Sequence, residues 1–271
     1  MNVSCSRQAA QRNTADQAAT DVVSAQTQGN DMAQEAQIPF QWQDETVIEV
    51  RSDEDIARIE EIFDPLLEAS DGEAVRAPLH AVVFVDSVAS LKKAVSQFGS
   101  FGDEVTTFEF RFTAPVDNSE EEIHLHQVEG VKARLILSGV GDKPVPVSLL
   151  RFDLRADVIQ LENLAWIGGS LPMSYVRAEV GQYLEMHNVT VSDNRYNFDQ
   201  EPDASPMFSV KPSPQAEKIL VSFDAVRFVR NQVHSLVNVL RRDGSEVRVK
   251  DVVFEDNVCF PGPCEFSGTE K

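Results

Sequence analysis

The sequence predicts an all-β protein of stacked, parallel strands, on two observations. First, alternating apolar residues interrupted by one small residue recur four times in the second half of the chain, at 159–166, 184–191, 221–228 and 247–254. Alternation with a period of two is typical of β-strands. Second, the interrupting residues are spaced by 25, 37 and 26 positions, and a repeat of that length is typical of a solenoid. We call these residues the pivots: Asn163, Asn188, Ala225 and Asp251.

Each pivot is predicted to mark a bend between two parallel strands. Asn and Asp tolerate the left-handed backbone conformation that such a bend requires, whereas Ala225 departs from the pattern. Stacking of the repeats then predicts two inward columns. One column holds Leu161, Met186, Phe223 and Val249, and the other holds Trp166, Val191, Phe228 and Phe254.

The motif apolar-x-apolar-x-Asn-apolar-x-apolar, complete at Asn163 and Asn188, resembles the coils of the right-handed parallel β-helix family. This is the solenoid of pectate lyases, polygalacturonases and many bacterial surface proteins. The resemblance covers residues 105–258 and implies about five to six coils of three short strands each. A β-sandwich or jelly roll is the alternative, because strand-turn repeats also occur there.

A second recurring position follows each pivot by six residues, where a coil would leave its third strand. It is occupied by Gly169, Asn194, Asn231 and Asn257. Working backward from the pivots places the first strands of the coils at 123–125, 150–152, 176–178, 208–210 and 237–239. The proline-rich stretch 195–218 is predicted to be an inserted loop, with one short strand at most, and a candidate partner-binding segment.

The residues before the coils divide into two regions. Residues 1–37, rich in Gln, Ala, Thr and Asp, are predicted to be a disordered tether. Residues 38–104 are predicted to form a strand-helix region, with strands at 46–50 and 81–85 and helices at 52–67 and 87–98. By the β-helix resemblance, the second helix would cap the stack.

The three cysteines bear on the compartment. Cys259 and Cys264 flank a Pro-Gly turn, which can bring them within bridging distance, so residues 259–271 are predicted to be a tail with a disulfide. Such a bond indicates an oxidising location: periplasmic, cell-surface or extracellular. The alternative is two reduced thiols. Cys5 follows small residues, as in a bacterial lipoprotein signal, and is a lipidation candidate, although the basic and apolar regions of such a signal do not precede it.

The net charge of −20 argues against nucleic acid or an anionic membrane surface as a partner. No apolar run approaches the length of a membrane span. A solvated surface explains the acidity most simply, and no calcium-binding motif supports a metal-based explanation. No cofactor motif is present either.

The candidate ligand-binding residues lie on the outward face of the predicted first strands. They are His124, Arg151, Asp153, Arg177 and Glu179. In the predicted stack, Arg151 and Arg177 share one column with Ser209 and Asn238, and Asp153 and Glu179 share a second with Lys211. Arginines beside acids can bind carboxylates or hydroxyls, but a solvated outer face would have the same composition. The pair His124 and His126 could hold Zn²⁺ only with a third ligand.

Catalytic signatures of the β-helix enzymes are missing from the sequence. It has no cluster of aspartates of the kind that inverting glycosidases of this family use, and no Arg-x-Pro-x-x-Arg motif of pectate lyases. The leading hypothesis is therefore a non-catalytic, secreted or surface-tethered protein that binds a glycan or a protein partner. The alternatives are a divergent polysaccharide lyase or hydrolase that uses the same face, and a structural assembly module.

Overall fold

Parallel β-sheets dominate the structure, which confirms the all-β prediction. The structure is a computed structural model that describes residues 46–51, 55, 79–98, 105–118, 125–129, 133–169, 175–195, 206–260 and 264. For residues 125–129 and for Gln97 only the backbone is described. The predicted tether 1–37, Cys5, His124 and most of the predicted helix 52–67 lie outside these residues.

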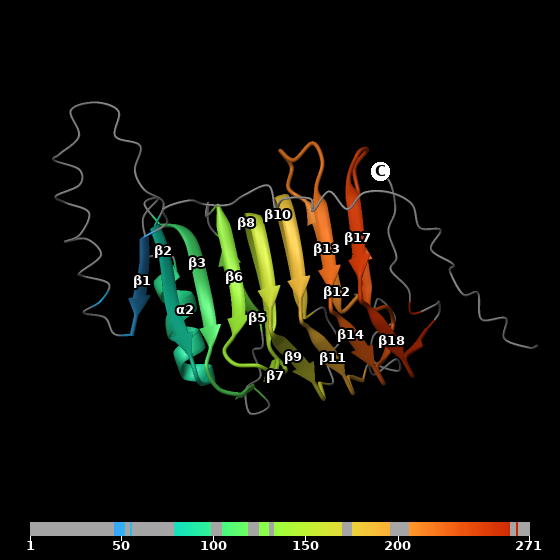
Figure 1. Ribbon diagram of the computed structural model, residues 1–271, viewed down its shortest axis with the longest axis horizontal. Helices are drawn as coiled ribbons and strands as arrows, with labels where there is room; N and C mark the ends of the chain where they lie inside the picture. The colour runs from blue at the N-terminus through green and yellow to red at the C-terminus, as the bar shows by residue number, and fades with distance from the viewer. Residues whose placement is uncertain are drawn as a thin grey trace, which may run out of the picture. The chain divides into compact units, whose positions relative to one another are not determined.

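The largest sheet, sheet A, runs along the whole stack (Figure 1). Its main path consists of β1 (Thr46–Val50), β2 (Leu79–Val85), β3 (Val105–Phe112), β6 (Arg134–Gly139), β8 (Arg151–Glu162), β10 (Val176–His187), β12 (Phe208–Pro212) and β16 (Val237–Val239). Three strands pair beside this path: β5 (Leu125–Glu129) on β8, β13 (Leu220–Asp224) on β10, and β17 (Glu246–Lys250) on β13.

A second sheet, sheet B, contains the strands that follow the four pivots and two earlier strands. Its order is β4 (Val116–Asp117), β7 (Val145–Ser148), β9 (Leu164–Ile167), β11 (Thr190–Ser192), β14 (Arg227–Val229) and β18 (Val253–Glu255), and Figure 1 shows β7 to β18 in this order from left to right. A small sheet pairs β15 (Gln232–Val233) with β19 (Val258–Cys259).

From β6 to β18 the chain passes repeatedly from sheet A to sheet B and back. Each strand pairs in parallel with the matching strand of the next repeat, as between β9 and β11 or β13 and β17. All strand pairs among the described residues are parallel, whereas sandwiches and jelly rolls are built from antiparallel strands. The arrangement is thus compatible with a β-helix or a related solenoid.

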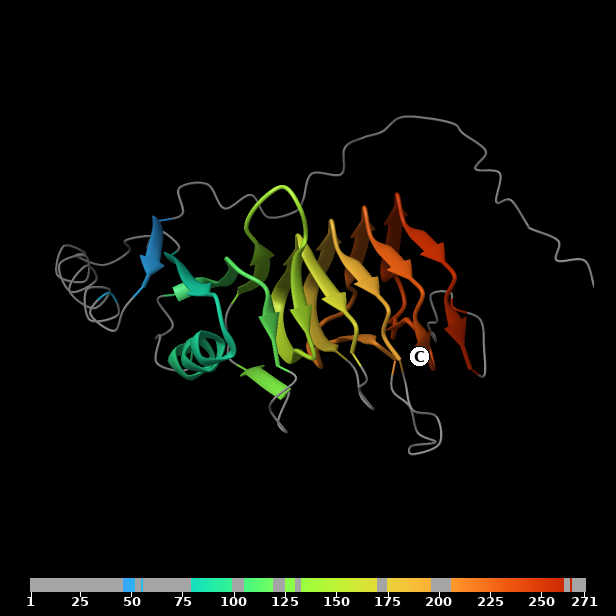
Figure 2. The same cartoon turned by 90° about the horizontal axis from the view of Figure 1, so that it is seen from below.

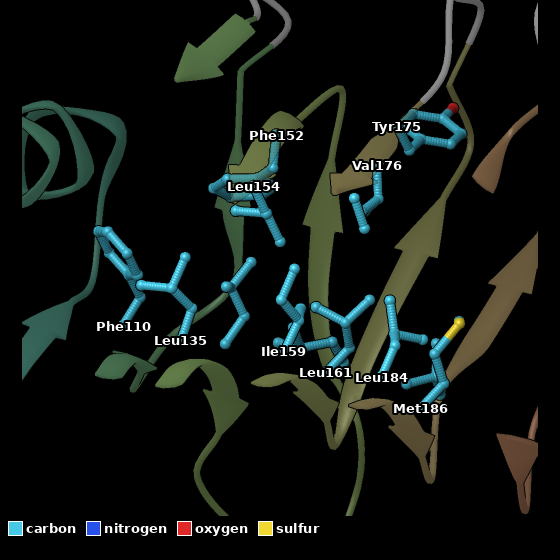
Figure 3. Close-up of a cluster of buried hydrophobic side chains, with 14 of the residues drawn as sticks. Phe110, Leu135, Phe152, Leu154, Ile159, Leu161, Tyr175, Val176, Leu184 and Met186 are labelled. Atoms are coloured by element: carbon cyan, nitrogen blue, oxygen red, sulfur yellow. The ribbon is translucent and has the colours of Figure 1, made fainter. Parts of the chain in front are cut away.

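The two predicted inward columns are confirmed. Met186 lies opposite both Leu161 and Phe223, and Phe223 lies opposite Val249. In sheet B, Trp166, Val191, Phe228 and Phe254 occupy neighbouring positions in the same way. Figure 3 shows the inward side chains of successive strands, including Leu161 and Met186, lined up between the sheets. All but the last member of each column are fully buried.

The pivots also behave as predicted, because all four have a left-handed backbone, with φ between 49° and 54°. Asn188 donates an amide hydrogen bond of 2.8 Å to the side-chain oxygen of Asn163. A second left-handed position follows five residues after each pivot, which the sequence analysis did not predict. Its members are Gly168, Asp193, Arg230 and Asp256, and Leu149 precedes them in the same column.

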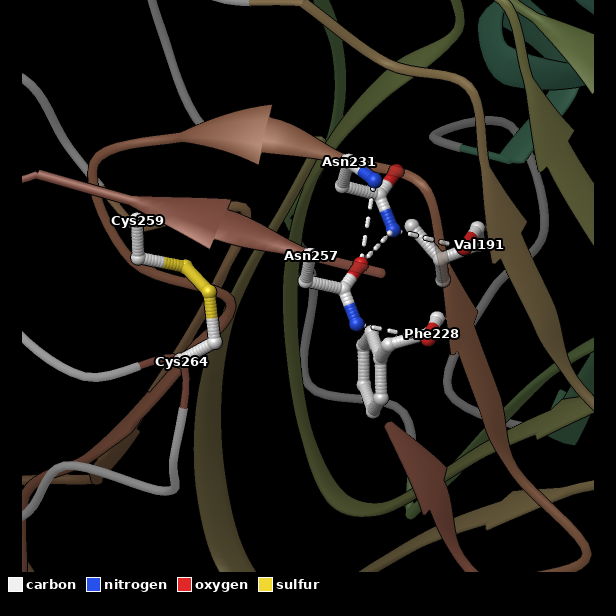
Figure 4. Close-up of a disulfide and its surroundings, with 6 residues drawn as sticks. All are labelled: Val191, Phe228, Asn231, Asn257, Cys259 and Cys264. Atoms are coloured by element: carbon white, nitrogen blue, oxygen red, sulfur yellow. Dashed lines mark hydrogen bonds between the residues drawn. A yellow bond between two sulfur atoms is a disulfide. The ribbon is translucent and has the colours of Figure 1, made fainter. Parts of the chain in front are cut away.

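The residues that follow this second bend form an asparagine ladder through the stack. The Asn194 amide donates to the Asn231 side-chain oxygen at 2.9 Å, and the Asn231 amide donates to Asn257 at 2.9 Å (Figure 4). At the other end, the Tyr175 hydroxyl donates to Asn194 at 2.7 Å. Position 169 is glycine because a Cβ there would lie 1.9 Å from that hydroxyl. The recurring position six residues after the pivot is therefore a buried hydrogen-bond chain.

The predicted first strands are partly wrong. Val176 lies opposite Phe152, not Leu150, and β8 and β10 continue without a turn into the strands that precede the pivots. A β-bulge in β10, where Gly181 and Gln182 lie opposite Asp157 alone, contributes to this error. The bulge adds one residue to this repeat, which accounts for one of the two residues between the predicted and the observed register. A Cβ at position 181 would clash with Asp157, which accounts for the glycine.

The one short strand predicted within the loop 195–218 is present, and it runs two residues beyond the predicted 208–210. Phe208–Pro212 forms β12, which lies between β10 and β16 in sheet A, and Phe208 is fully buried. The two-residue spacing of Phe208 and Val210 outweighs the surrounding prolines, because Pro212 stands at the end of the strand. Residues 196–205 lie outside the described residues.

At the other end of the stack, α2 (Val88–Phe98) packs against β2 and β3 (Figure 2). Its buried residues are Leu91, Ala94 and Phe98, and the Phe98 ring contacts Phe108 edge-on with centroids 5.0 Å apart. The Ser87 hydroxyl accepts a hydrogen bond of 3.2 Å from the backbone N–H of Ser90 at the helix start. The predicted helix 87–98 and the strands at 46–50 and 81–85 are confirmed.

The predicted disulfide is present: Cys259 and Cys264 are bonded, with Cα atoms 5.2 Å apart (Figure 4). It lies at the last strand of the stack and closes a short loop. No helix among the described residues is long and apolar enough to cross a membrane.

Candidate functional site

A polar groove of about 300 Å³ lies on the outer face of β8, β10 and β12. It is lined by Asp153, Leu154, Arg155, Arg177, Ala178, Glu179, Ser209 and Lys211. Three of the five predicted ligand-binding residues, Asp153, Arg177 and Glu179, are among them. The strands carry these side chains outward because residues two apart on a strand share a face, while Phe152 and Leu154 point to the core.

Glu179 stands at the centre of a three-residue ionic row. Its neighbours across the strands are Arg155 on β8 and Lys211 on β12. The Lys211 ammonium lies 2.8 Å from one carboxylate oxygen and the Arg155 guanidinium 3.3 Å from the other. Glu179 is buried between them, whereas the side chains of Arg155 and Lys211 are more than half exposed. Both carboxylate oxygens are therefore engaged, and the two cations keep their outer surfaces in water.

Arg177 belongs to a second row, in which it lies between Asp153 on β8 and Ser209 on β12. Asn238 on β16 extends this row by one more strand. Arg177 is half-buried and makes no ion pair with any other described residue. Its guanidinium is thus available for a ligand, with a carboxylate, a hydroxyl and an amide in line with it at a strand spacing of about 4.8 Å.

Arg151 does not join this groove as predicted. Arg151 is buried, lies opposite Leu125 on β5, and is not among the groove-lining residues. It is separated from Arg177 because the true register places Asp153, not Arg151, beside that residue. His124 lies outside the described residues, and so does the side chain of His126.

Arg155 is the groove residue that the sequence analysis missed. The predicted strand stopped at Phe152, but the polar alternation continues through Arg151, Asp153, Arg155 and Asp157. Extending that alternation by two residues would have found it. Ser209 and Lys211 were placed on the outer face, although not among the chosen site residues.

The groove is electrostatically unlike the rest of the chain. Its lining carries Arg155, Arg177 and Lys211 against Asp153 and Glu179, a local excess of positive charge in a protein of net charge −20. Guanidinium groups hold carboxylates through two parallel hydrogen bonds, and the neighbouring hydroxyl and amide groups suit sugar hydroxyls. The arrangement can bind a polar, carboxylate-bearing ligand.

A second ionic cluster lies between β2, β3 and β6 around a buried carboxylate. Glu109 contacts the His80 imidazole at 2.9 Å and the Arg111 guanidinium at 2.8 Å, and accepts a hydrogen bond from Ser138. Burial raises the pKa of this carboxyl, but the hydrogen bonds from His80, Arg111 and Ser138 outweigh burial and lower the pKa to about 2. The cluster thus satisfies a buried carboxylate, and its partly exposed Arg111 is already paired with that carboxylate.

Among the residues that the structure describes, no group of three or more His, Cys, Asp or Glu side chains could hold a metal ion. Comparisons with family models, curated proteins and solved structures found no match to this chain.

Proposed function

We propose that this chain is a non-catalytic member of the right-handed parallel β-helix superfamily that binds an acidic glycan in the groove on β8, β10 and β12. The chain would form about five to six coils, with α2 as the N-terminal cap. The observation that carries the proposal is the position of Arg177, a half-buried guanidinium with no ion pair among the described residues, at the centre of a polar row.

The chemistry of the row favours a chain of sugars that bears carboxylates. Arg177 binds a carboxylate bidentately, while Asp153, Ser209 and Asn238 exchange hydrogen bonds with hydroxyl groups. A ligand lying across the strands meets one of these side chains about every 4.8 Å. A flat protein surface would need a larger and more apolar contact area than this groove provides, so a protein partner is the less favoured ligand.

Binding is favoured over catalysis because of Glu179. A general acid or base must be free to exchange a proton with its substrate, and both oxygens of Glu179 are held by Arg155 and Lys211. Asp153 alone does not make the carboxylate pair that glycoside hydrolysis requires. A divergent lyase or hydrolase is thus the second hypothesis, and a purely structural assembly module is the third.

The Cys259–Cys264 disulfide supports a location in an oxidising compartment: periplasmic, cell-surface or extracellular. Attachment to a membrane through a lipidated Cys5 remains part of this proposal. The predicted tether 1–37 would then separate the groove from the membrane.

The test is titration calorimetry with a polyuronate and with a neutral polysaccharide of equal length. We expect the wild type to bind the polyuronate and Arg177→Ala to bind it roughly 10- to 100-fold more weakly, as expected for loss of a charged hydrogen-bonding pair. The matched control is Arg227→Ala, which removes an exposed arginine from sheet B and should leave binding unchanged.

Two results would contradict the proposal. If neither polysaccharide binds, the groove is not a glycan site. If the polyuronate is cleaved and cleavage disappears in Arg177→Ala, the chain is an enzyme, and the lyase or hydrolase hypothesis replaces the binding hypothesis.

A further inference from the structure

The C-terminal end of the stack is an edge in every sheet. Its last strands, β16, β17, β18 and β19, each pair with an earlier strand on one side, and no described strand pairs with the other side. Their outer backbone N–H and C=O groups face the end of the stack. Such edges readily accept a further strand from another chain.

The apolar columns are also partly exposed at these last strands, β16 to β19, which we call the C-terminal rung. Phe223 and Phe228 are fully buried, but their successors Val249 and Phe254 are 51% and 40% exposed. Val258 is exposed as well. Large apolar side chains gathered at one end of a molecule are typical of an interaction surface.

Among the described residues, the opposite end of the stack is built differently, although its first strand β1 is also a sheet edge. There, α2 packs against the Phe108 side of the first strands, and sheet B begins only at β4. A head-to-tail contact would place an open coil against a helix-filled end. Two C-terminal ends, in contrast, present equivalent edges and equivalent apolar columns to each other, as in an isologous two-fold dimer.

The charges on β17 favour this pairing. A two-fold axis across the end of the stack reverses the winding direction of the partner chain, so β17 meets its copy antiparallel. A register centred on Arg248 then places Glu246 opposite Lys250 of the second copy, and Val247 opposite Val249. Opposite charges alternate with apolar residues on the two faces, and such cross-strand pairs stabilise antiparallel strands. Only Arg248 meets a like charge.

We propose that the C-terminal rung is a self-association surface, on which a second copy of this chain docks end to end through antiparallel pairing of β17. The inference is independent of the groove, which lies on the outer face of β8, β10 and β12. Loss of self-association would leave the glycan proposal intact, and the reverse also holds.

Charge inversion tests the pairing through sedimentation velocity over a concentration series. Wild type should dimerise in a concentration-dependent manner. Glu246→Lys and Lys250→Glu each place like charges opposite each other twice in the dimer, so each variant alone should dimerise at least roughly tenfold more weakly. An equimolar mixture of the two variants restores opposite charges at both positions and should form a heterodimer.

The mixture separates an effect on strand pairing from an effect on folding. Mixing cannot repair a folding defect in either variant, but it does restore the opposite charges between the two copies. Glu246 also pairs with Arg248 at 2.7 Å and Lys250 with Asp224 at 3.2 Å, but exposed pairs of this kind contribute little. Lys143→Glu, an equal charge change in an exposed turn, is the control and should dimerise like the wild type. The proposal is overturned if the wild type stays monomeric over the whole concentration series, as it would if its own terminal residues covered the rung. It is also overturned if the mixture associates no more strongly than either variant alone.

Discussion

The middle of the stack and its last rung have the same residue pattern but different burial. Phe223 and Val249 are neighbours in one column, yet Phe223 is fully buried and Val249 is half exposed. In the asparagine ladder, Asn231 is fully buried and bonded on both sides, whereas Asn257 is its terminal described member. The contribution of a repeat residue thus depends on whether a neighbouring coil lies on each side of it, as in other repeat proteins.

The largest expected effect comes from a charge placed in the column. Phe223→Asp buries an unpaired carboxylate at the centre of the stack and should lower the free energy of unfolding by at least about 4 kcal/mol. Val249→Asp makes the same chemical change one rung later, where water reaches the side chain, and should lower it by about 1 kcal/mol or less. Urea unfolding followed by circular dichroism measures both.

These measurements belong at a protein concentration where the wild type is monomeric, because association would add to the apparent stability of the last rung. Equal losses in the two variants would show that the last rung is as well covered as the middle. A Phe223→Asp variant that unfolds like the wild type would show that the register of the column is wrong.

The ladder gives the next largest contrast. Asn231→Ala removes the acceptor for the Asn194 amide and the donor to the Val191 carbonyl, and leaves both buried without these partners (Figure 4). We expect the free energy of unfolding to fall by about 3 kcal/mol, since each unsatisfied buried group costs about 1–3 kcal/mol. Asn257→Ala, at the end of the ladder, should lower the free energy of unfolding by about 1 kcal/mol, because water can replace the hydrogen bonds of Asn257. Thermal unfolding of the two variants measures both losses. An equal fall in their unfolding temperatures would show that the end of the ladder is as important as its middle.

The most local effect is expected for the disulfide. Closing so short a loop stabilises by about 2 kcal/mol on the chain-entropy estimate. The bond joins Cys259 and Cys264 at the last rung only. Replacing both cysteines by serine should increase amide hydrogen exchange in β15 and β19 and leave β8 and β10 protected. Faster exchange throughout the stack would mean that the last rung is essential to the whole.

The strands around the pivots could be predicted from the sequence because two independent signals coincide there. Apolar alternation marks the strands, and Asn or Asp marks the left-handed bend between them. Ala225 has the same φ without a polar side chain, so the repeat spacing identified it and the residue type did not. The Asn ladder was visible as a recurring position, but its hydrogen bonds follow only from the stacking.

The first strands were harder to predict because no such marker defines their register. The bulge at Gly181 shifts the count by one residue, and nothing in the local sequence distinguishes that glycine from a turn residue. Because the predicted register was two residues off, Arg151 was placed in the groove and Arg155 was not. Asp153, Arg177 and Glu179 were found because outward polar residues keep their face even when the strand boundary is wrong.

The parallel pairing of each strand with the preceding repeat bears on how the chain folds during synthesis. The partner of β11 is β9, and the partner of β14 is β11, so each new strand meets a template made 25 to 37 residues earlier. Loop closure at this range costs nearly the same at every step, because the entropy depends only on the logarithm of the separation. Folding can therefore proceed from the N-terminal side during translation. At each stage the most recently synthesised coil is the one whose outer edge is still unpaired.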